Sequence, residues 1–394
     1  MKIIFVDEGI DRVGGVERTV STLANQLSLN NDVKVISEVK TSLNPYYSYT
    51  TQIKRFYLND YTKSKAKKRN KKDLLYFICR TPEKAVEKLR MPQKIKTTIS
   101  QFLTQADVIV FGRIHTALHF LRYFKKYELN AKVVVRDAMF LNYYSKHMQR
   151  KIKKYFSKYV NHFIVSSDES LEAYTRFFHG SSIKLKKIYN PLGIKPVCSY
   201  KYNSKTIISI GRMDKQKGYD ALIDAFKFVY SKHPDWKLEI YGDGSYKKKI
   251  KQLIEKENLE KSVFLKPSTK NVVEVFNRSS IFVLASRYEG YANVLVEALA
   301  CGIPSISYDW LMGVNEIIKD DVNGKIVSLE NRRNYMHGKN DPEDIKKLAD
   351  CINYLIENKE VCDKMVKNSI SIQESRNPKK IMQEWQNIIL KEKK

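Results

Sequence analysis

Two glutamates stand at the start of a predicted helix and could serve one ligand together. Glu289 and Glu297 have seven residues between them, and the apolar run Ile281–Leu284 comes just before them. That run predicts a buried strand, and a helix starting near Ala292 would place free backbone N–H groups at the strand's carboxyl end, where parallel sheets bind anions. Carboxylates there can accept hydrogen bonds from sugar hydroxyls while the N–H groups hold phosphate oxygens. The pattern also fits two exposed glutamates at a helix start, where acids are favoured anyway.

Two cations follow another predicted strand of the same region. Arg212 and Lys217 come after the apolar run Thr206–Ile210 and before the next helix. Arginine can bind a diphosphate as a bidentate fork and lysine as a point charge. Both would also stabilise the negative charge on a departing nucleoside diphosphate. The alternative is two surface cations in a lysine-rich chain.

Taken together, the motifs of this chain resemble glycosyltransferase family 4, the retaining enzymes of the GT-B fold. The resemblance extends over nearly the whole chain and is densest from Thr206 to Val327. Each motif is weak alone, and the combination is specific. In chain order the motifs are Gly14-Gly15-Val16-Glu17, Gly211-Arg212 with Lys217-Gly218, Glu289 with Glu297, Ala300-Cys301-Gly302-Ile303-Pro304, Gly313 with Glu316, and Asn323-Gly324.

The resemblance implies a hexosyltransferase and assigns roles to individual residues. Glu297 would bind the ribose of the donor nucleotide, and Glu289 would contact the hydroxyls of the transferred sugar. Arg212 and Lys217 would hold the diphosphate, so that Glu289, Arg212 and Lys217 form the catalytic group. Gly15 would allow the backbone to approach the phosphates closely. The whole donor-binding set is Gly15, Arg212, Lys217, Glu289, Gly290, Tyr291, Ala292, Asn293, Val294, Leu295 and Glu297.

One position departs from the family pattern. Many members carry a histidine before an aspartate in the first domain, where this chain has Arg136-Asp137 after the apolar run Val133–Val135. His115 or His119 could face the donor instead, although an ordinary core or surface histidine is the commoner case. No general base is therefore assigned. Retaining transfer need not use one, because the departing phosphate can itself take the proton of the acceptor.

We expect no metal and no bound cofactor. The chain has no Asp-x-Asp triplet, which metal-dependent glycosyltransferases of the other major fold use to chelate the diphosphate through a cation. Arg212 and Lys217 would neutralise the charge that a metal neutralises elsewhere. The co-substrate would be a nucleotide-diphosphate sugar, with a UDP-sugar as the first choice.

The formal net charge of +28 is concentrated in the first half of the chain. Residues 1–195 have a net charge of +21 and residues 196–394 one of +7. The run Lys63–Lys72 is strongly basic, and the predicted helix Tyr143–Tyr159 mixes lysines with aromatic residues. Such a helix could lie on an anionic membrane or grip a lipid pyrophosphate, or it could simply be a solvated face. The proposed membrane or acceptor contacts are Lys151, Lys153, Lys154 and Lys158.

The elements that must position these residues alternate between strand and helix along the chain, which predicts an α/β fold. The Pro and Gly residues around Tyr189–Gly193 interrupt the pattern, so we expect two Rossmann-like domains whose parallel sheets face a central cleft. Residues 1–192 would form the acceptor domain, residues 193–377 the donor domain, and residues 378–394 a C-terminal helix that packs back on the first domain.

Composition narrows the location. No apolar stretch is long enough for a membrane span, the N-terminus lacks a signal-peptide core, and the five cysteines form no CxxC pair. We expect a cytoplasmic enzyme, peripheral on the inner face of the cytoplasmic membrane.

The predicted function is retaining transfer of a sugar to a lipid-linked or polysaccharide acceptor in bacterial cell-surface glycan synthesis. Two alternatives remain. One is a non-catalytic or nucleic-acid-binding basic protein, although no nucleic-acid module is visible and nucleic acid is not an expected partner. The other is a GT-B nucleotide-sugar epimerase, whose site motifs we do not find.

Overall fold

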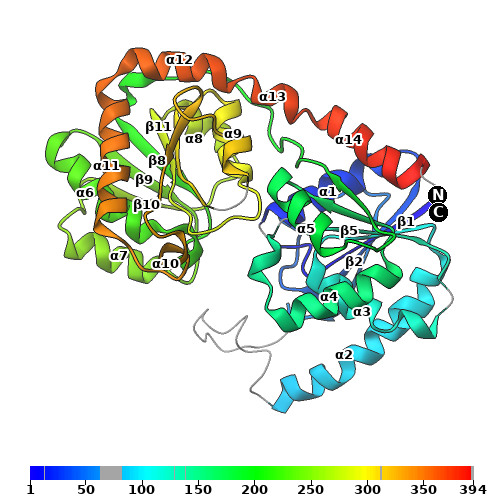
Figure 1. The fold of residues 1–394 in the computed structure, drawn as a ribbon. Coiled ribbons are helices and arrows are strands. Elements are labelled where there is room, and N and C mark those ends of the chain that lie inside the picture. Colours follow the sequence, from blue (N-terminus) through cyan, green and yellow to red (C-terminus); the bar gives the residue numbers. More distant parts are fainter. Residues whose placement is uncertain (13, 63–81, 128, 138, 311–312, 392–394) are drawn as a thin grey trace. The chain divides into compact units, whose positions relative to one another are not determined.

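The chain divides into two compact units of α/β structure. A computed structural model describes residues 1–12, 14–62, 82–127, 129–137, 139–310 and 313–391. Unit 1 comprises Met1–Gly193 and Pro378–Lys394, and unit 2 comprises Ile194–Asn377. The boundary lies next to the one expected at residue 192, and the C-terminal segment belongs to unit 1 (Figure 1). The basic run Lys63–Lys72 lies outside the described residues.

Unit 1 is built on a parallel sheet with the strand order β3-β2-β1-β4-β5-β6-β7. Helices pack on both of its faces, as parallel sheets require. The strands are β1 (Lys2–Asp7), β2 (Asp32–Lys40), β3 (Lys54–Asp60), β4 (Val108–Phe111), β5 (Lys132–Arg136), β6 (His162–Val165) and β7 (Lys184–Lys187). The helices are α1 (Gly15–Leu27), α2 (Pro82–Gln101), α3 (Ile114–Leu121), α4 (Lys146–Tyr159), α5 (Asp168–Phe177) and α14 (Pro378–Gln386).

The C-terminal segment completes one face of the unit 1 sheet. Trp385 is 1% exposed and belongs to the apolar cluster that contains Ile3 and Phe5 of β1. After α14 the segment Asn387–Lys391 forms a π-helical turn. The ammonium of buried Lys132, on β5, donates to the carbonyl of Ile388 at 2.8 Å. This lysine therefore satisfies a helix end that would otherwise be buried without partners.

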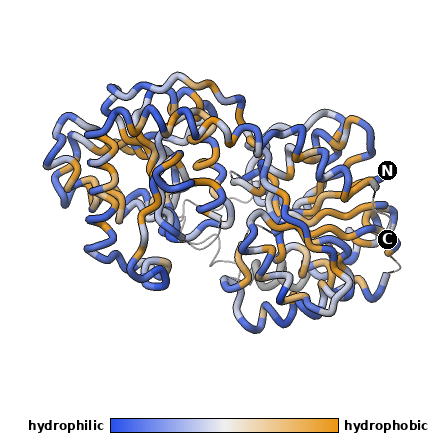
Figure 2. The backbone as a smooth tube through the Cα atoms, turned by 45° about the horizontal axis from the view of Figure 1, so that its top comes forward, coloured by the Kyte–Doolittle hydropathy of each residue, from blue (hydrophilic) through white to orange (hydrophobic). Residues whose placement is uncertain are grey.

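Unit 2 repeats the design with the strand order β10-β9-β8-β11-β12-β13. The strands are β8 (Thr206–Ile210), β9 (Lys237–Tyr241), β10 (Val263–Lys266), β11 (Ile281–Leu284), β12 (Ser305–Tyr308) and β13 (Gly324–Val327). The helices are α6 (Tyr219–Lys232), α7 (Lys247–Lys256), α8 (Val272–Asn277), α9 (Asn293–Ala300), α10 (Arg332–Met336), α11 (Pro342–Glu357), α12 (Lys359–Ser369) and α13 (Ile372–Ser375). In both units the strands at the centre are the most apolar part of the chain (Figure 2).

The strand order of each sheet reverses once. In unit 1, β1 pairs with β2 on one side and with β4 on the other. In unit 2, β8 pairs with β9 on one side and with β11 on the other. Loops leaving the carboxyl ends of the two central strands diverge at such a switch point, and the crevice between them is where open α/β sheets bind ligands. Each unit therefore offers one predictable place for a site.

None of the helices in the described ranges is both long enough and apolar enough to span a lipid bilayer.

Candidate active site

At the switch point of unit 2, two predicted site residues form an ion pair. Lys217, which follows β8, places its ammonium 2.6 Å from Glu289 Oε1, in the loop after β11. The hydroxyl of Ser286 donates to the same oxygen at 2.6 Å. The side chains of Lys217 and Glu289 are only 14% and 9% exposed. The structure thus joins a cation and a carboxylate to which the sequence assigns separate roles.

Buried Arg287 holds the two loops of this switch point together. Its side chain is 1% exposed and donates to the carbonyl of Lys215 at 3.1 Å and to Asp220 Oδ2 at 2.6 Å. A third bond reaches the carbonyl of Tyr335 at 2.9 Å, and the backbone N–H of Arg287 donates to Gln216 O at 2.7 Å. Because both loops are anchored through one guanidinium, the Lys217–Glu289 pair is positioned without a ligand.

A close backbone approach at Gly218 makes this arrangement possible. Gly218 has a φ of +63°, and a Cβ there would lie 1.9 Å from the carbonyl oxygen of Ala285. No larger residue fits, because both the left-handed backbone and the contact exclude a side chain. The glycine therefore lets the loop after β8 rest against the end of β11.

Arg212 is the exposed cation of the site. Its side chain is 60% exposed and pairs with Asp214 at 3.0 Å on the same loop. An exposed ion pair of this kind contributes little stability and exchanges readily. Arg212 can therefore turn from Asp214 to a phosphate at low cost.

In the loop before α9, some of the backbone N–H groups expected to bind the donor are already hydrogen-bonded within the protein. The N–H of Asn293 donates to Tyr291 O at 3.0 Å, and that of Leu295 donates to Ala292 O at 3.0 Å. Ala292 is the N-cap residue of α9, and its methyl side chain cannot cap the helix. Two of the expected N–H donors are already bonded within the turn. Gly290 and Val294 lie in the same stretch and are half-buried.

Glu297 lies just over a turn inside α9 and is 2% exposed. It is therefore far more enclosed than a glutamate on a solvated helix face. Glu289 and Glu297 thus lie in different surroundings. Glu289 pairs with Lys217, whereas Glu297 is a buried residue within α9.

The switch point of unit 1 carries a different ionic cluster. Arg113, after β4, donates to Asp7 Oδ1 at 3.0 Å and to Glu17 Oε1 at 2.5 Å. Asp7 is fully buried at the end of β1, and burial raises the pKa of its carboxyl to about 6 even though Arg113 opposes the shift. Glu17 folds back over Gly14, where a Cβ would lie 2.3 Å from Glu17 Oε2. Gly15 is the first residue of α1, beside this cluster.

Arg136 and Asp137, at the position where the family usually has a histidine, are both buried. Arg136 donates to Asn190 Oδ1, and burial lowers its pKa to about 10. Asp137 accepts from the hydroxyls of Tyr144 at 3.0 Å and Tyr174 at 3.2 Å, and burial raises its pKa to about 7. These contacts tie β5 to its neighbours, which gives the pair a structural role.

The two candidate histidines are engaged within unit 1. His119 places Nδ1 2.8 Å from Oε1 of the buried Glu38. The ring of His115 lies 5.6 Å from that of Tyr144, and burial lowers the pKa of His115. Neither contact identifies a general base.

The helix α4 is shorter than the expected Tyr143–Tyr159, and its aromatic residues do not all face outward. It begins at Lys146, and Phe156 packs in the core, as does Tyr144 ahead of the helix. Tyr144 and Phe156 are therefore not available for contact with a membrane surface. The lysines do lie on the exposed face, namely Lys151, Lys153, Lys154 and Lys158.

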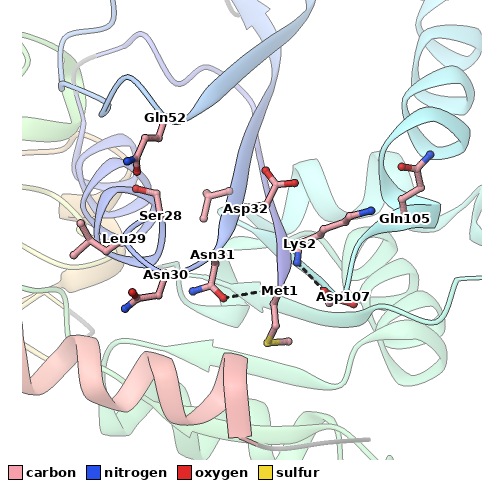
Figure 3. A pocket seen from close by; sticks show the side chains of 11 residues that line it. Met1, Lys2, Ser28, Leu29, Asn30, Asn31, Asp32, Gln52, Gln105 and Asp107 are labelled. Carbon is pink, nitrogen blue, oxygen red and sulfur yellow. Dashed lines mark hydrogen bonds between the residues drawn. The ribbon is translucent and has the colours of Figure 1, made fainter.

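A broad hollow in unit 1 lies at the opposite edge of the sheet from the switch point. Figure 3 shows its lining at the amino ends of β1 and β2, where the N–H of Lys2 donates to Asp107 Oδ2 at 2.7 Å and the terminal amine of Met1 lies 3.3 Å from Asn31 Oδ1. Ligands of parallel α/β sheets bind at carboxyl ends, so we assign the hollow no catalytic role.

The chain is similar to known glycosyltransferases. Residues 199–371, within unit 2, match the family model described as glycosyl transferases group 1. An uncharacterized glycosyltransferase of Haemophilus influenzae is 26% identical over 393 residues, covering 98% of this chain and 99% of the relative. A Campylobacter jejuni relative, an N-acetylgalactosaminyltransferase whose name specifies a diphospho-undecaprenol acceptor, is 31% identical over 48% of this chain and 55% of its own.

Solved structures show the same fold. An Anabaena protein solved in complex with UDP-glucose superposes with a TM-score of 0.71 at 16% identity, covering 99% of each chain. These findings do not favour a non-catalytic protein, a nucleic-acid-binding protein or an epimerase. The match of residues 199–371 to glycosyl transferases group 1, the relatives named as glycosyltransferases and the shared fold together show that the chain is a glycosyltransferase with the GT-B fold.

Proposed function

We propose that this enzyme transfers a sugar from a UDP-sugar, with retention of configuration and without a metal, to a lipid-linked or polysaccharide acceptor in bacterial surface glycan synthesis. The observation that carries the proposal is the Lys217–Glu289 pair at the switch point of unit 2. The Anabaena structure with UDP-glucose and the undecaprenol-linked acceptor of the Campylobacter relative support the choice of donor and acceptor class.

Lys217 and Glu289 would bind different parts of the donor. The ammonium of Lys217 and the fork of Arg212 would bind the two phosphates, and Glu289 would then accept hydrogen bonds from sugar hydroxyls. Charge accumulates on the phosphate as the glycosidic bond breaks, and cations held in place stabilise that charge without reorganising. The departing phosphate would take the proton of the acceptor hydroxyl, so the proposal needs no protein base.

A ligand screen followed by a donor assay tests the proposal. Thermal unfolding is measured with UDP, GDP, their sugar conjugates and AMP, because a ligand that binds only the folded state raises apparent stability. Donor hydrolysis is then followed in excess EDTA, and NMR of the released sugar gives its configuration. We expect UDP-sugars to stabilise most, hydrolysis to persist in EDTA and the configuration to be retained. A strict need for Mg²⁺ or Mn²⁺, or an inverted product, would refute the corresponding part.

We also propose that α4 brings unit 1 to an anionic membrane. Its four exposed lysines, Lys151, Lys153, Lys154 and Lys158, support this. Each basic residue near such a surface contributes about 1 kcal/mol, so several would hold the enzyme reversibly. We expect salt-sensitive sedimentation with phosphatidylglycerol liposomes and little with phosphatidylcholine. Replacing all four by Glu should abolish it while UDP binding survives, and equal binding to both liposomes would contradict the proposal.

A further inference from the structure

Helix α9, whose N-terminus is part of the proposed donor site, is contacted at both ends by one short segment of chain. This segment, Ile372–Asn377, contains α13 and is the last part of unit 2 before the chain returns to unit 1 at Pro378. It packs along α9. Both contacts at the ends of α9 come from side chains of this segment, so the donor site and the return of the chain share a physical connection.

The first contact is made by a buried arginine. Arg376 is 2% exposed, and its Nε donates to the hydroxyl of Tyr291, in the loop immediately before α9. Its Nη2 donates to the carbonyl of Glu316 at 3.3 Å, in the loop after β12. A guanidinium that is out of water requires such partners, because an unpaired buried cation is costly. Arg376 therefore fixes Tyr291 from outside the loop that contains it.

The second contact lies at the other end of the helix. Gln373 donates from Nε2 to the carbonyl of Ala300, the last residue of α9, at 2.7 Å. The thiol of Cys198, four residues after the chain first enters unit 2 at Ile194, contacts the same carbonyl at 3.4 Å. The two crossings of the chain between the units are thus both connected to the C-terminal end of α9.

We propose that Arg376 is a positioning residue for the donor site, acting through Tyr291. Arg376 lies in the segment Ile372–Asn377 and fixes the position of the loop before α9. Nucleotide binding at that loop and the order of the segment are therefore coupled. The coupling is reciprocal, as any linkage between two equilibria must be. The part that concerns the nucleotide rests on the proposed function, whereas the positioning of the loop does not.

Amide hydrogen exchange of the ligand-free protein tests the positioning. Tyr291→Phe removes only the hydroxyl and should not prevent folding. Tyr291→Phe and Arg376→Gln, as single variants, should each speed amide exchange of residues 289–295 several-fold. Arg376→Lys should keep part of the protection that Arg376→Gln loses. Lys367→Gln, on the exposed surface of α12, is the matched control and should change nothing. Unchanged exchange of residues 289–295 in Tyr291→Phe would overturn the proposal.

Adding UDP tests the coupling. In the wild type, UDP should slow exchange in residues 372–377. Tyr291→Phe and Arg376→Gln should each weaken UDP binding by at least about fivefold, and the double variant should be no weaker than either single variant. Additive losses, or protection of residues 372–377 that survives in Tyr291→Phe, would overturn the coupling. If UDP protects neither residues 211–218 nor residues 286–295 in the wild type, the proposed donor is wrong, and the ligand-free experiment still decides the role of Arg376.

Discussion

The two switch points occupy the same place in two similar sheets, yet they use charge differently. In unit 1 one arginine, Arg113, lies between two buried carboxylates, Asp7 and Glu17, so the acids outnumber the cation. In unit 2 Lys217 pairs with the single carboxylate of Glu289, and a second cation, Arg212, is 60% exposed beside it. The large positive charge of residues 1–195 is therefore not concentrated at their switch point. An anionic diphosphate is better suited to unit 2, although unit 1 carries more of the net charge.

The largest expected effect concerns the stability that the ionic cluster gives to unit 1. Arg113→Gln leaves two buried carboxylates without their cation, and we expect a loss of about 3–5 kcal/mol in the free energy of unfolding. Affinity for UDP should change much less, because the cluster is in unit 1. Denaturant unfolding and calorimetric titration measure the two quantities. Arg122→Gln, at the exposed residue after the other end of α3, should stay within about 0.5 kcal/mol of the wild type. A greater effect on UDP than on stability would reverse the comparison.

Lys217→Ala tests whether the cations of unit 2 act in catalysis. We expect kcat to fall by about 10²–10³-fold, since a preorganised donor to the leaving group is lost, while stability changes little. Arg212→Ala should also lower kcat more than it weakens UDP binding, because the charge develops in the transition state. Steady-state kinetics in EDTA measure both variants. Equal losses in kcat and in UDP affinity would mean that these cations only bind the ground state.

Glu297→Ala is expected to act on binding alone. Removing a charged acceptor from the proposed ribose contact should weaken UDP binding by about 1.5–3 kcal/mol. Titration with UDP measures the loss, and Glu274→Ala, on the exposed surface of α8, is the control. A folded Glu297 variant with wild-type affinity would show that the ribose assignment is wrong.

A further effect depends on pH and is confined to unit 1. Asp137 has a pKa of about 7 against an ordinary value of 3.8, so the folded protein holds a proton that the unfolded chain has already released. Its contribution to stability is complete below pH 3.8 and is lost as the pH rises towards 7, by at most about 1.4 kcal/mol per pH unit. Asp137→Asn should flatten the decline in thermal midpoint over that range. An unchanged slope would show that Asp137 is ionised in the folded protein.

Sequence reasoning recovers the elements that are apolar throughout. The runs Thr206–Ile210 and Ile281–Leu284 are strands with those limits, because strands buried on both faces need uninterrupted apolar side chains. The apolar run Val133–Val135 marks only the middle of β5, which begins at Lys132 and ends at Arg136, and the edge strand β3 is not predicted at all. Both have polar or partly exposed residues, whose order depends on pairing with a neighbour rather than on their own composition.

The candidate site divides in the same way. Arg212, Lys217 and Glu289 could be placed on neighbouring loops because motifs and strand order locate them. The Lys217–Glu289 bond, the clamp by Arg287 and the contact between Arg376 and Tyr291 could not, since they join residues up to 85 positions apart through side-chain geometry. Arg376 belongs to none of the sequence motifs, and its burial depends on partners that are distant in the chain.

The C-terminal segment has a consequence for how the protein is made. Trp385, Ile388 and Ile389 belong to the core of unit 1, but the ribosome synthesises them after the whole of unit 2. While residues 194–377 are being translated, the apolar face that α14 later covers is without its partner. Unit 2 is continuous in sequence and can finish folding first, whereas unit 1 begins first and finishes last. We expect the nascent chain to be most prone to aggregation, and most dependent on chaperones, in that interval.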